Sequence, residues 1–123
     1  MWMENIGVWF DIPVTDIERA KKFYTAILGV TFLDMEHTNN RIAMFPFEKN
    51  VVSGALVEHP DNQPSTSGTI IYLNGGKDLN IPLSKVEKSG GEIIQEKTSI
   101  KEYGYIAYFK DTEGNKIGIH SMG

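Results

Sequence analysis

The sequence predicts a single α+β domain made of two βαβββ modules. Three observations support this prediction. The chain has 123 residues, the size of one compact domain. The order strand, helix and three strands occurs twice, and "ILGVTFLD" and "SGGEIIQE" occupy matching places, each a glycine stop followed by a strand. The modules span about residues 4–58 and 69–121, and the polar, proline-containing segment 59–68 joins them.

The first module begins with a strand and a helix. Segment 6–14 is apolar, aromatic and β-branched, which is typical of a strand. Segment 15–30 has apolar residues at helical spacing, and Thr15 or Asp16 is placed to cap its start. Gly29 is placed to end the helix. Three further strands are expected at 31–36, 41–47 and 51–58.

The second module repeats this order. Segment 69–75 predicts a strand, and segment 77–91 predicts a helix that ends at paired glycines. Proline is tolerated only in the first turn of a helix, so Pro82 requires this helix to start near Asn80 or Ile81. Three strands are then expected at 92–95 (with a possible extension to 98), 105–110 and 116–120.

Composition excludes several classes of function. The net charge is −4 and no basic block exists, so neither nucleic acid nor an anionic membrane is an expected partner. The absence of cysteine excludes disulfides, thiolate metal ligands and a cysteine nucleophile, and it fits a reducing cytoplasm. The sequence has neither a signal-peptide pattern nor an apolar stretch of about 20 residues. A cytoplasmic protein is therefore expected.

Two segments carry a resemblance to a known family. They are "FDIPVTDIERAKKFYTAILGV" at the front and "YIAYFKDTEGNKIGI" at the back. Together with the double βαβββ order, they resemble the vicinal-oxygen-chelate superfamily of glyoxalases, bleomycin resistance proteins and extradiol dioxygenases. The resemblance implies that the two modules form a curved mixed-sheet cup that holds one ligand, and that the protein is a homodimer. It leaves open whether the modules pair within one chain or between chains.

The resemblance also implies where a metal site would lie. In metal-dependent members, up to four His, Gln or Glu side chains converge on the floor of the cup. The corresponding positions here hold Trp9, Gly54, Thr69 and Gly118. An indole offers no lone pair, glycine has no side chain, and a neutral hydroxyl is a poor sole ligand for a divalent ion. The sequence therefore predicts no metal and no other cofactor, and these four residues are expected to contact a ligand instead.

His120 and Asp11 are the candidate catalytic residues. His120 shares a strand face with Gly118, so it is expected to line the cup as a ligand-binding or acid–base group. Asp11 could pair with His120 and fix its tautomer, and Glu58 could join them in a displaced metal site. The alternatives are that His120 only forms a local hydrogen bond and that Asp11 bonds the backbone or an arginine. Trp9 is expected to form an aromatic wall, and loop 100–106 is either a flap over the cup or a solvated turn.

Three functions follow from these residues. The first is a metal-independent protein of the glyoxalase family that binds a small, partly aromatic ligand in the cup. The second is a metal-free enzyme that uses His120 and Asp11 for proton transfer. The third is a metal-dependent lyase or isomerase of glyoxalase type, which the missing ligands disfavour. Whether the protein is an enzyme stays open at this point.

Overall fold

A computed structural model describes residues 5–37 and 40–123, and these residues form an α+β fold with two four-stranded mixed sheets. The predicted start of the first module, residue 4, lies outside the described residues. The strands are β1 (Trp9–Pro13), β2 (Leu33–His37), β3 (Asn40–Met44), β4 (Ser53–Glu58), β5 (Tyr72–Asn74), β6 (Glu92–Ser99), β7 (Tyr105–Lys110) and β8 (Lys116–Ser121).

The first sheet has the order β1-β4-β3-β2, with β1 parallel to β4 and the other pairs antiparallel. Its residues alternate between two faces, as the period of a strand requires. Ile12 and Leu56 are buried in the core. Trp9 and Asp11 lie on the opposite face of β1, which no helix covers and which is called here the open face of the first sheet.

The second sheet has the matching order β5-β8-β7-β6. β5 runs parallel to β8, and the other neighbours are antiparallel. Ile117 and Ile119 of β8 are buried in the core. Gly118 and His120 therefore lie on the open face of the second sheet, as their spacing predicted.

Helix α1 (Ile17–Leu28) has the caps that the sequence predicted. The side chain of Asp16 accepts a hydrogen bond from the Arg19 amide at 3.1 Å, so Asp16 rather than Thr15 is the N-cap. Gly29 ends the helix in the left-handed conformation, with φ of 69°. The apolar side of the helix, with Phe23 and Tyr24, is buried against the sheets.

The helix expected over 77–91 is shorter than predicted. It consists of α2 (Asn80–Leu83) and the 3₁₀ turn η1 (Glu87–Ser89), and its start agrees with the constraint set by Pro82. The Lys85 amide bonds the Pro82 carbonyl and the Val86 amide bonds that of Leu83, both over three residues, so the segment tightens into 3₁₀ geometry. The expected loop 100–106 contains a second 3₁₀ turn, η2 (Lys101–Tyr103).

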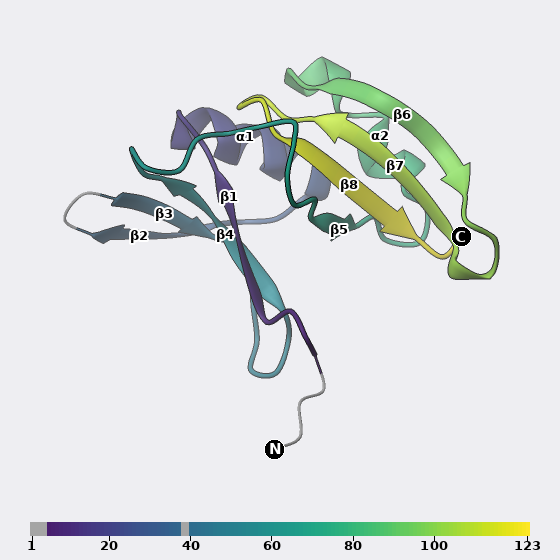
Figure 1. Cartoon of the computed structure of the whole chain (residues 1–123), viewed down its shortest axis with the longest axis horizontal. Helices are drawn as coiled ribbons and strands as arrows, with labels where there is room; N and C mark the ends of the chain where they lie inside the picture. Colours follow the sequence, from purple (N-terminus) through teal and green to yellow (C-terminus); the bar gives the residue numbers. More distant parts are fainter. Residues whose placement is uncertain (1–4, 38–39) are drawn as a thin grey trace.

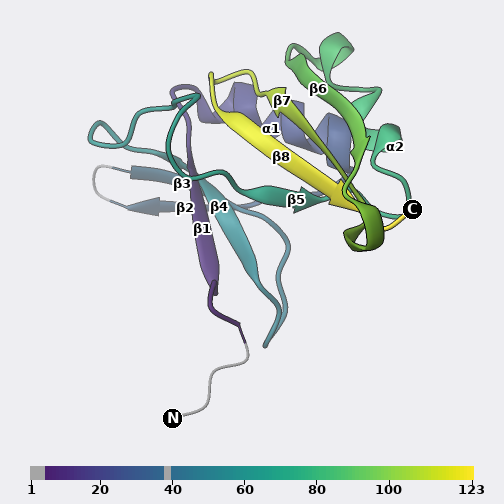
Figure 2. The same cartoon turned by 45° about the vertical axis from the view of Figure 1, so that its right-hand side comes forward.

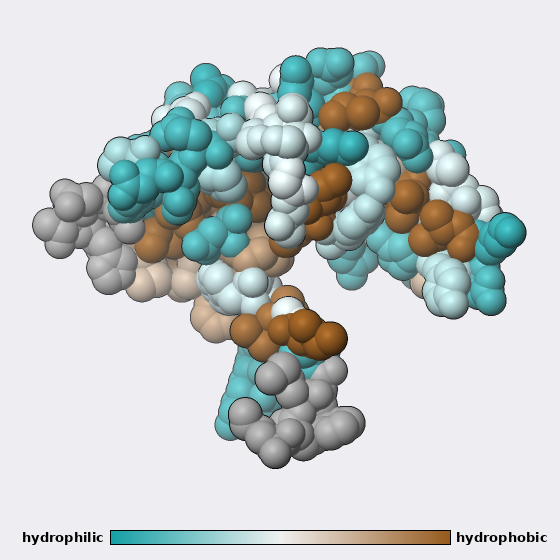
Figure 3. Space-filling model, viewed as in Figure 1, coloured by the Kyte–Doolittle hydropathy of each residue, from teal (hydrophilic) through white to brown (hydrophobic). Residues whose placement is uncertain are grey.

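The two sheets diverge from α1, and the resulting shape, with one sheet as each limb, is called here the arch (Figures 1 and 2). The tips of β1 and β4 project away from the helix, and the second sheet forms the other limb. Hydrophobic side chains are visible along the underside of the arch and on the projecting limb (Figure 3). In the described part of the chain, no helix has the length and apolarity needed to cross a membrane.

Candidate functional site

A groove lies at the seam between the two sheets, beside β1, β4 and β5. Its volume is about 600 Å³. The first module contributes Phe10, Phe45 and Val52 to its lining, and the second contributes Tyr72 and Asn74. The rings of Phe10 and Phe45 lie 5.7 Å apart and tilted. Both modules are thus needed to form this mostly apolar groove.

Tyr72 extends the lining of the groove onto the open face of the second sheet. Tyr72 and Gly118 are partners in the parallel β5–β8 pairing, and Tyr108 is the antiparallel partner of Gly118. The hydroxyls of Tyr72 and Tyr108 form a short hydrogen bond across Gly118, and this arrangement is called here the tyrosine pair. The hydrogen bond with Tyr108 and partial burial raise the pKa of Tyr72 above its ordinary value.

The space expected beside Gly118 is filled by the ring of Tyr72. A Cβ atom at Gly118 would lie 2.5 Å from Cδ2 of that ring, closer than any real Cβ contact. Glycine is therefore required for the ring to lie over β8 and reach Tyr108. The Lys116 ammonium lies 4.7 Å from the centroid of the Tyr108 ring on the same face.

The structure does not bring Asp11 and His120 together. Asp11 lies in the first sheet, and its Oδ1 accepts a hydrogen bond from Trp9 Nε1 at 3.1 Å. His120 lies in the second sheet, and its Nε2 is 2.7 Å from the carbonyl oxygen of Tyr103 in η2. The pairing of Asp11 with His120 that the sequence left open is not formed, since β1 and β8 belong to different sheets, and His120 instead has the local hydrogen bond of the alternative interpretation.

Two other expected positions also differ from the prediction. Gly54 lies on the core face of β4, because a Cβ atom there would meet Cδ1 of the Phe10 ring at 2.5 Å. Glu58 shares the parity of Gly54, and its Oε2 accepts a hydrogen bond from the Ile17 amide at 3.0 Å. Glu58 therefore binds the start of α1 and does not join Asp11 and His120.

Trp9 and Thr69 are both exposed in this structure. The Trp9 ring packs edge-on against Phe47, with centroids 5.8 Å apart, on the open face of the first sheet. Thr69 precedes β5 and lines a small pocket of about 90 Å³ together with Asp11 and Lys116. This pocket shares no lining residue with the larger groove.

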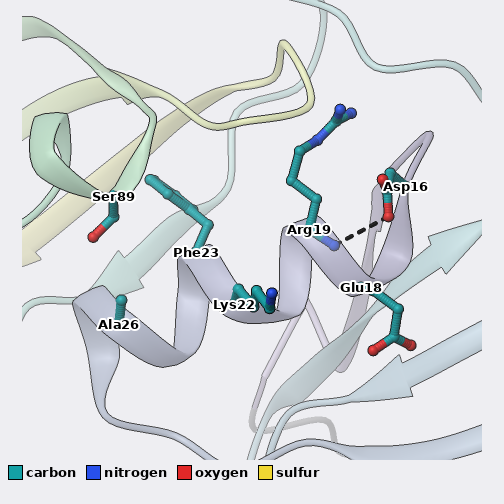
Figure 4. Close-up of a pocket in the computed structure, with 7 residues that line it drawn as sticks. All are labelled: Asp16, Glu18, Arg19, Lys22, Phe23, Ala26 and Ser89. Atoms are coloured by element: carbon teal, nitrogen blue, oxygen red, sulfur yellow. Dashed lines mark hydrogen bonds between the residues drawn. The ribbon is translucent and has the colours of Figure 1, made fainter.

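A separate cleft of about 460 Å³ runs along the outer side of α1, between the helix and η1 (Figure 4). Arg19 and Lys22 give it positive groups, and Phe23 and Ala26 give it apolar ones. The Arg19 guanidinium already binds the Glu113 carboxylate at 2.8 Å. The cleft contains none of the residues that the sequence singled out for function.

The comparison with known families agrees with this architecture. The family model described as the glyoxalase/bleomycin resistance protein/dioxygenase superfamily matches residues 8–119. The chain belongs to this superfamily. A glyoxylase-like domain-containing protein of Didymella fabae is 30% identical over 116 residues, which cover 89% of this chain and 88% of that protein.

Several solved structures show the same fold. The glyoxylase/bleomycin resistance protein/dioxygenase domain from Frankia sp. EAN1pec superposes with a TM-score of 0.73 at 15% identity, over the full length of both chains. TnmS3, an antibiotic binding protein from Streptomyces sp. CB03234, superposes with a TM-score of 0.66 at 22% identity, also over both full lengths. At these identities the likeness concerns the fold.

The residues present do not fit the metal site of the superfamily. Among residues 5–37 and 40–123, no three His, Cys, Asp or Glu side chains lie close enough together to hold a metal ion. The Phe10 ring occupies the space beside Gly54, and the Tyr72 ring occupies the space beside Gly118. A ligating side chain at either glycine would require those rings to move.

No sequence pattern indicates the tyrosine pair. Tyr72 and Tyr108 are conspicuous aromatic residues, but they are 36 residues apart and no spacing rule joins them. Only the register of β5 and β7 on either side of β8 places both beside Gly118. A glycine within a predicted strand was the available signal, because it indicates that another group approaches the backbone closely.

Proposed function

We propose that this superfamily member binds a planar, partly aromatic small molecule in the seam groove, without a metal ion. The observation that carries the proposal is the apolar, aromatic lining of a groove of about 600 Å³. Small-molecule sites are typically apolar concavities of roughly 300–1,000 Å³ with a few polar groups. The antibiotic-binding role of TnmS3 is consistent with such a use of the fold.

The uncharged aromatic amide 2-naphthamide tests this proposal. Its binding to the full chain is measured by ligand-detected NMR. We expect saturable binding that EDTA leaves unchanged and that Val52→Arg abolishes, since Val52 lines the groove. Val51→Arg is the matched control, because Val51 is the exposed neighbour that lies outside the lining.

Three results would contradict the proposal. They are no detectable binding, equal binding by both arginine variants, and binding that disappears with EDTA. The last result would instead favour a metal-dependent activity of glyoxalase type. Stoichiometric retention of Ni²⁺, Zn²⁺ or Mn²⁺ after dialysis would support that alternative.

The geometry favours binding over acid–base catalysis by His120 and Asp11. One imidazole nitrogen of His120 is held by the Tyr103 carbonyl, and the Asp11 carboxylate is held by Trp9. A general base needs a partner or substrate within hydrogen-bond reach of the proton it removes. We therefore propose that His120 positions the η2 turn through its hydrogen bond with the Tyr103 carbonyl. We also propose that Trp9 forms an aromatic wall on the first sheet.

We also propose that the protein forms a homodimer through the open face of the first sheet. Two cross-strand rows of apolar residues lie on this face, because partners in a ladder share a face. The rows are Leu33–Met44–Ala55 and Met35–Ile42–Val57. Ala55 and Val57 are buried, but Leu33 and Met35 at the edge of the sheet are exposed and Ile42 and Met44 beside them are half-buried, so the apolar surface lies on β2 and β3 and is of the kind that marks an interface.

Analytical ultracentrifugation tests the dimer. We expect the wild-type chain to sediment as a dimer and Met35→Glu to sediment as a monomer at the same concentration. Met122→Glu is the control, since Met122 is an exposed methionine near the end of the chain. A monomeric wild type would overturn this proposal without affecting the ligand proposal.

A further inference from the structure

The tyrosine pair has one phenolic hydrogen left to donate. The two hydroxyls together carry two hydrogens, and the bond between them uses one, whichever oxygen is the donor. Within the described residues, neither hydroxyl bonds a third group. Tyr72 is 48% exposed and lines the seam groove, whereas Tyr108 lies outside that lining.

The charge beside the pair is positive. Lys116 lies over the Tyr108 ring and forms no salt bridge with any described residue. Lys110 faces Lys116 across the β7–β8 pairing. Its Nζ atom is 3.5 Å from Glu92 Oε1, so the Glu92 carboxylate partly neutralises the charge of Lys110. Asp11 lines the same small pocket as Lys116, but its carboxylate bonds the Trp9 indole.

We propose that Tyr72, Tyr108 and Lys116 bind a carboxylate carried by the planar ligand in the groove. This inference rests on the proposed function and specifies its ligand class as aromatic carboxylates. A free phenolic hydrogen and an ammonium group both favour an anionic oxygen acceptor over a neutral one. Tyr72 belongs both to the groove and to the pair, so one ligand can place its ring in the first and its carboxylate at the second.

The experiment compares two probes that share one ring system. 2-Naphthoate carries the carboxylate, and 2-naphthamide is its neutral counterpart. We expect the wild-type chain to bind naphthoate more tightly than naphthamide. Lys116→Gln should weaken naphthoate binding about tenfold, as expected for loss of an ion pair to a charged group, and leave naphthamide within about twofold. Tyr108→Phe leaves the Tyr72 hydroxyl one hydrogen to donate but removes the bond that orients it, so it should weaken naphthoate binding by less than Lys116→Gln does.

Two further variants make the test specific. Gly118→Ala keeps both tyrosines but displaces the Tyr72 ring, which belongs to the groove as well as to the pair, so it should weaken the binding of both probes and of naphthoate more. Tyr103→Phe is the control, because Tyr103 is an exposed tyrosine in η2 whose carbonyl, not its hydroxyl, contacts His120. Thermal unfolding of each variant establishes that it is folded before binding is compared.

The outcomes separate this inference from the proposed function. If wild type binds naphthamide and naphthoate equally, the carboxylate site is wrong and the groove proposal stands. If Tyr108→Phe and Lys116→Gln weaken both probes equally, the pair is only a wall of the groove, and the inference is again wrong. If neither probe binds to wild type, both proposals fail.

Discussion

At the scale of single residues, Glu113 in the turn between β7 and β8 accepts several hydrogen bonds through its side chain. Its carboxylate is fully buried and accepts hydrogen bonds from the amides of Thr15 and Asp16, at 2.9 and 2.8 Å. The Arg19 guanidinium donates two more, and the Thr112 hydroxyl donates another. A negative charge at the start of α1 is also favoured by the helix dipole. Glu113 thereby attaches the β7–β8 turn of the second module to the helix of the first.

The pKa of Glu113 predicts an acid-dependent loss of stability. Burial alone would raise this pKa, but the hydrogen bonds from Arg19, Asp16, Thr112 and Thr15 outweigh it and lower the pKa from 4.5 to about 2. A carboxylate whose pKa is lowered by folding stabilises the folded state at pH values above its pKa in the unfolded chain. This contribution, about 3 kcal/mol, should disappear as the pH falls from 4.5 to about 2.

Glu113→Gln tests this assignment through urea unfolding at a series of pH values. We expect the variant to be less stable than wild type by about 2–3 kcal/mol at neutral pH, because it loses the charge-assisted bonds. The difference should shrink toward pH 2 as wild type becomes protonated. Glu92→Gln, an exposed partner of Lys110, is the control and should change stability little. A difference that does not depend on pH would contradict the assignment.

At the scale of elements, α1 is specified by its own ends. Asp16 satisfies an amide of the first turn, and the Gly29 amide bonds the Thr25 carbonyl to close the last turn. Gly29 has a φ of 69°, and a Cβ atom placed there would meet nothing within 4 Å. A side chain at this position would therefore lower the stability of the fold only through the unfavourable backbone conformation, not through a steric clash.

Two substitutions at Gly29 measure that cost. Gly29→Ala should lower the free energy of unfolding by about 1–2 kcal/mol, because an L-residue is disfavoured in the left-handed region. Gly29→Asn should cost less, since asparagine tolerates this conformation better. Equal stabilities of the alanine and asparagine variants, measured by urea unfolding, would show that the end of α1 is not limited by φ.

At the scale of the whole molecule, the two modules share one hydrophobic core and are linked by hydrogen bonds of buried side chains. The buried core contains residues of both modules, among them Phe23 of α1 and Phe109 of β7, whose rings lie 5.8 Å apart. The Tyr24 hydroxyl donates to Asp111 Oδ2 at 2.6 Å, and both side chains are buried. Asn115 Nδ2 donates to the Pro13 carbonyl at 2.7 Å. The modules should therefore unfold together.

Cooperative unfolding can be checked with two signals. Trp9 lies in β1, so in a Trp2→Phe background tryptophan fluorescence reports on the first module, whereas far-ultraviolet circular dichroism reports on both modules. The two signals should give the same urea midpoint. Tyr24→Phe should lower both midpoints together, with a loss of about 1–3 kcal/mol, because Asp111 loses a buried donor. Separate midpoints, in wild type or variant, would show that the modules unfold independently.

The sequence predicted the elements well where the signal is local. The caps of α1, the limits of β7 and the start of α2 follow from residues within each segment, because propensity and capping act over a few positions. The open-face position of Gly118 and His120 follows from strand alternation. Superfamily membership follows from the same double order of elements.

Only the tertiary structure decided which side chains meet. Asp11 and His120 are on the predicted faces but in different sheets, and Gly54 lies beneath Phe10 instead of facing the ligand. Tyr72 and Tyr108 meet because strand order and register bring β5 and β7 to the two sides of β8. The periodicity of a strand determines the face of each residue, but pairing between distant segments is set by how the sheets assemble around one core.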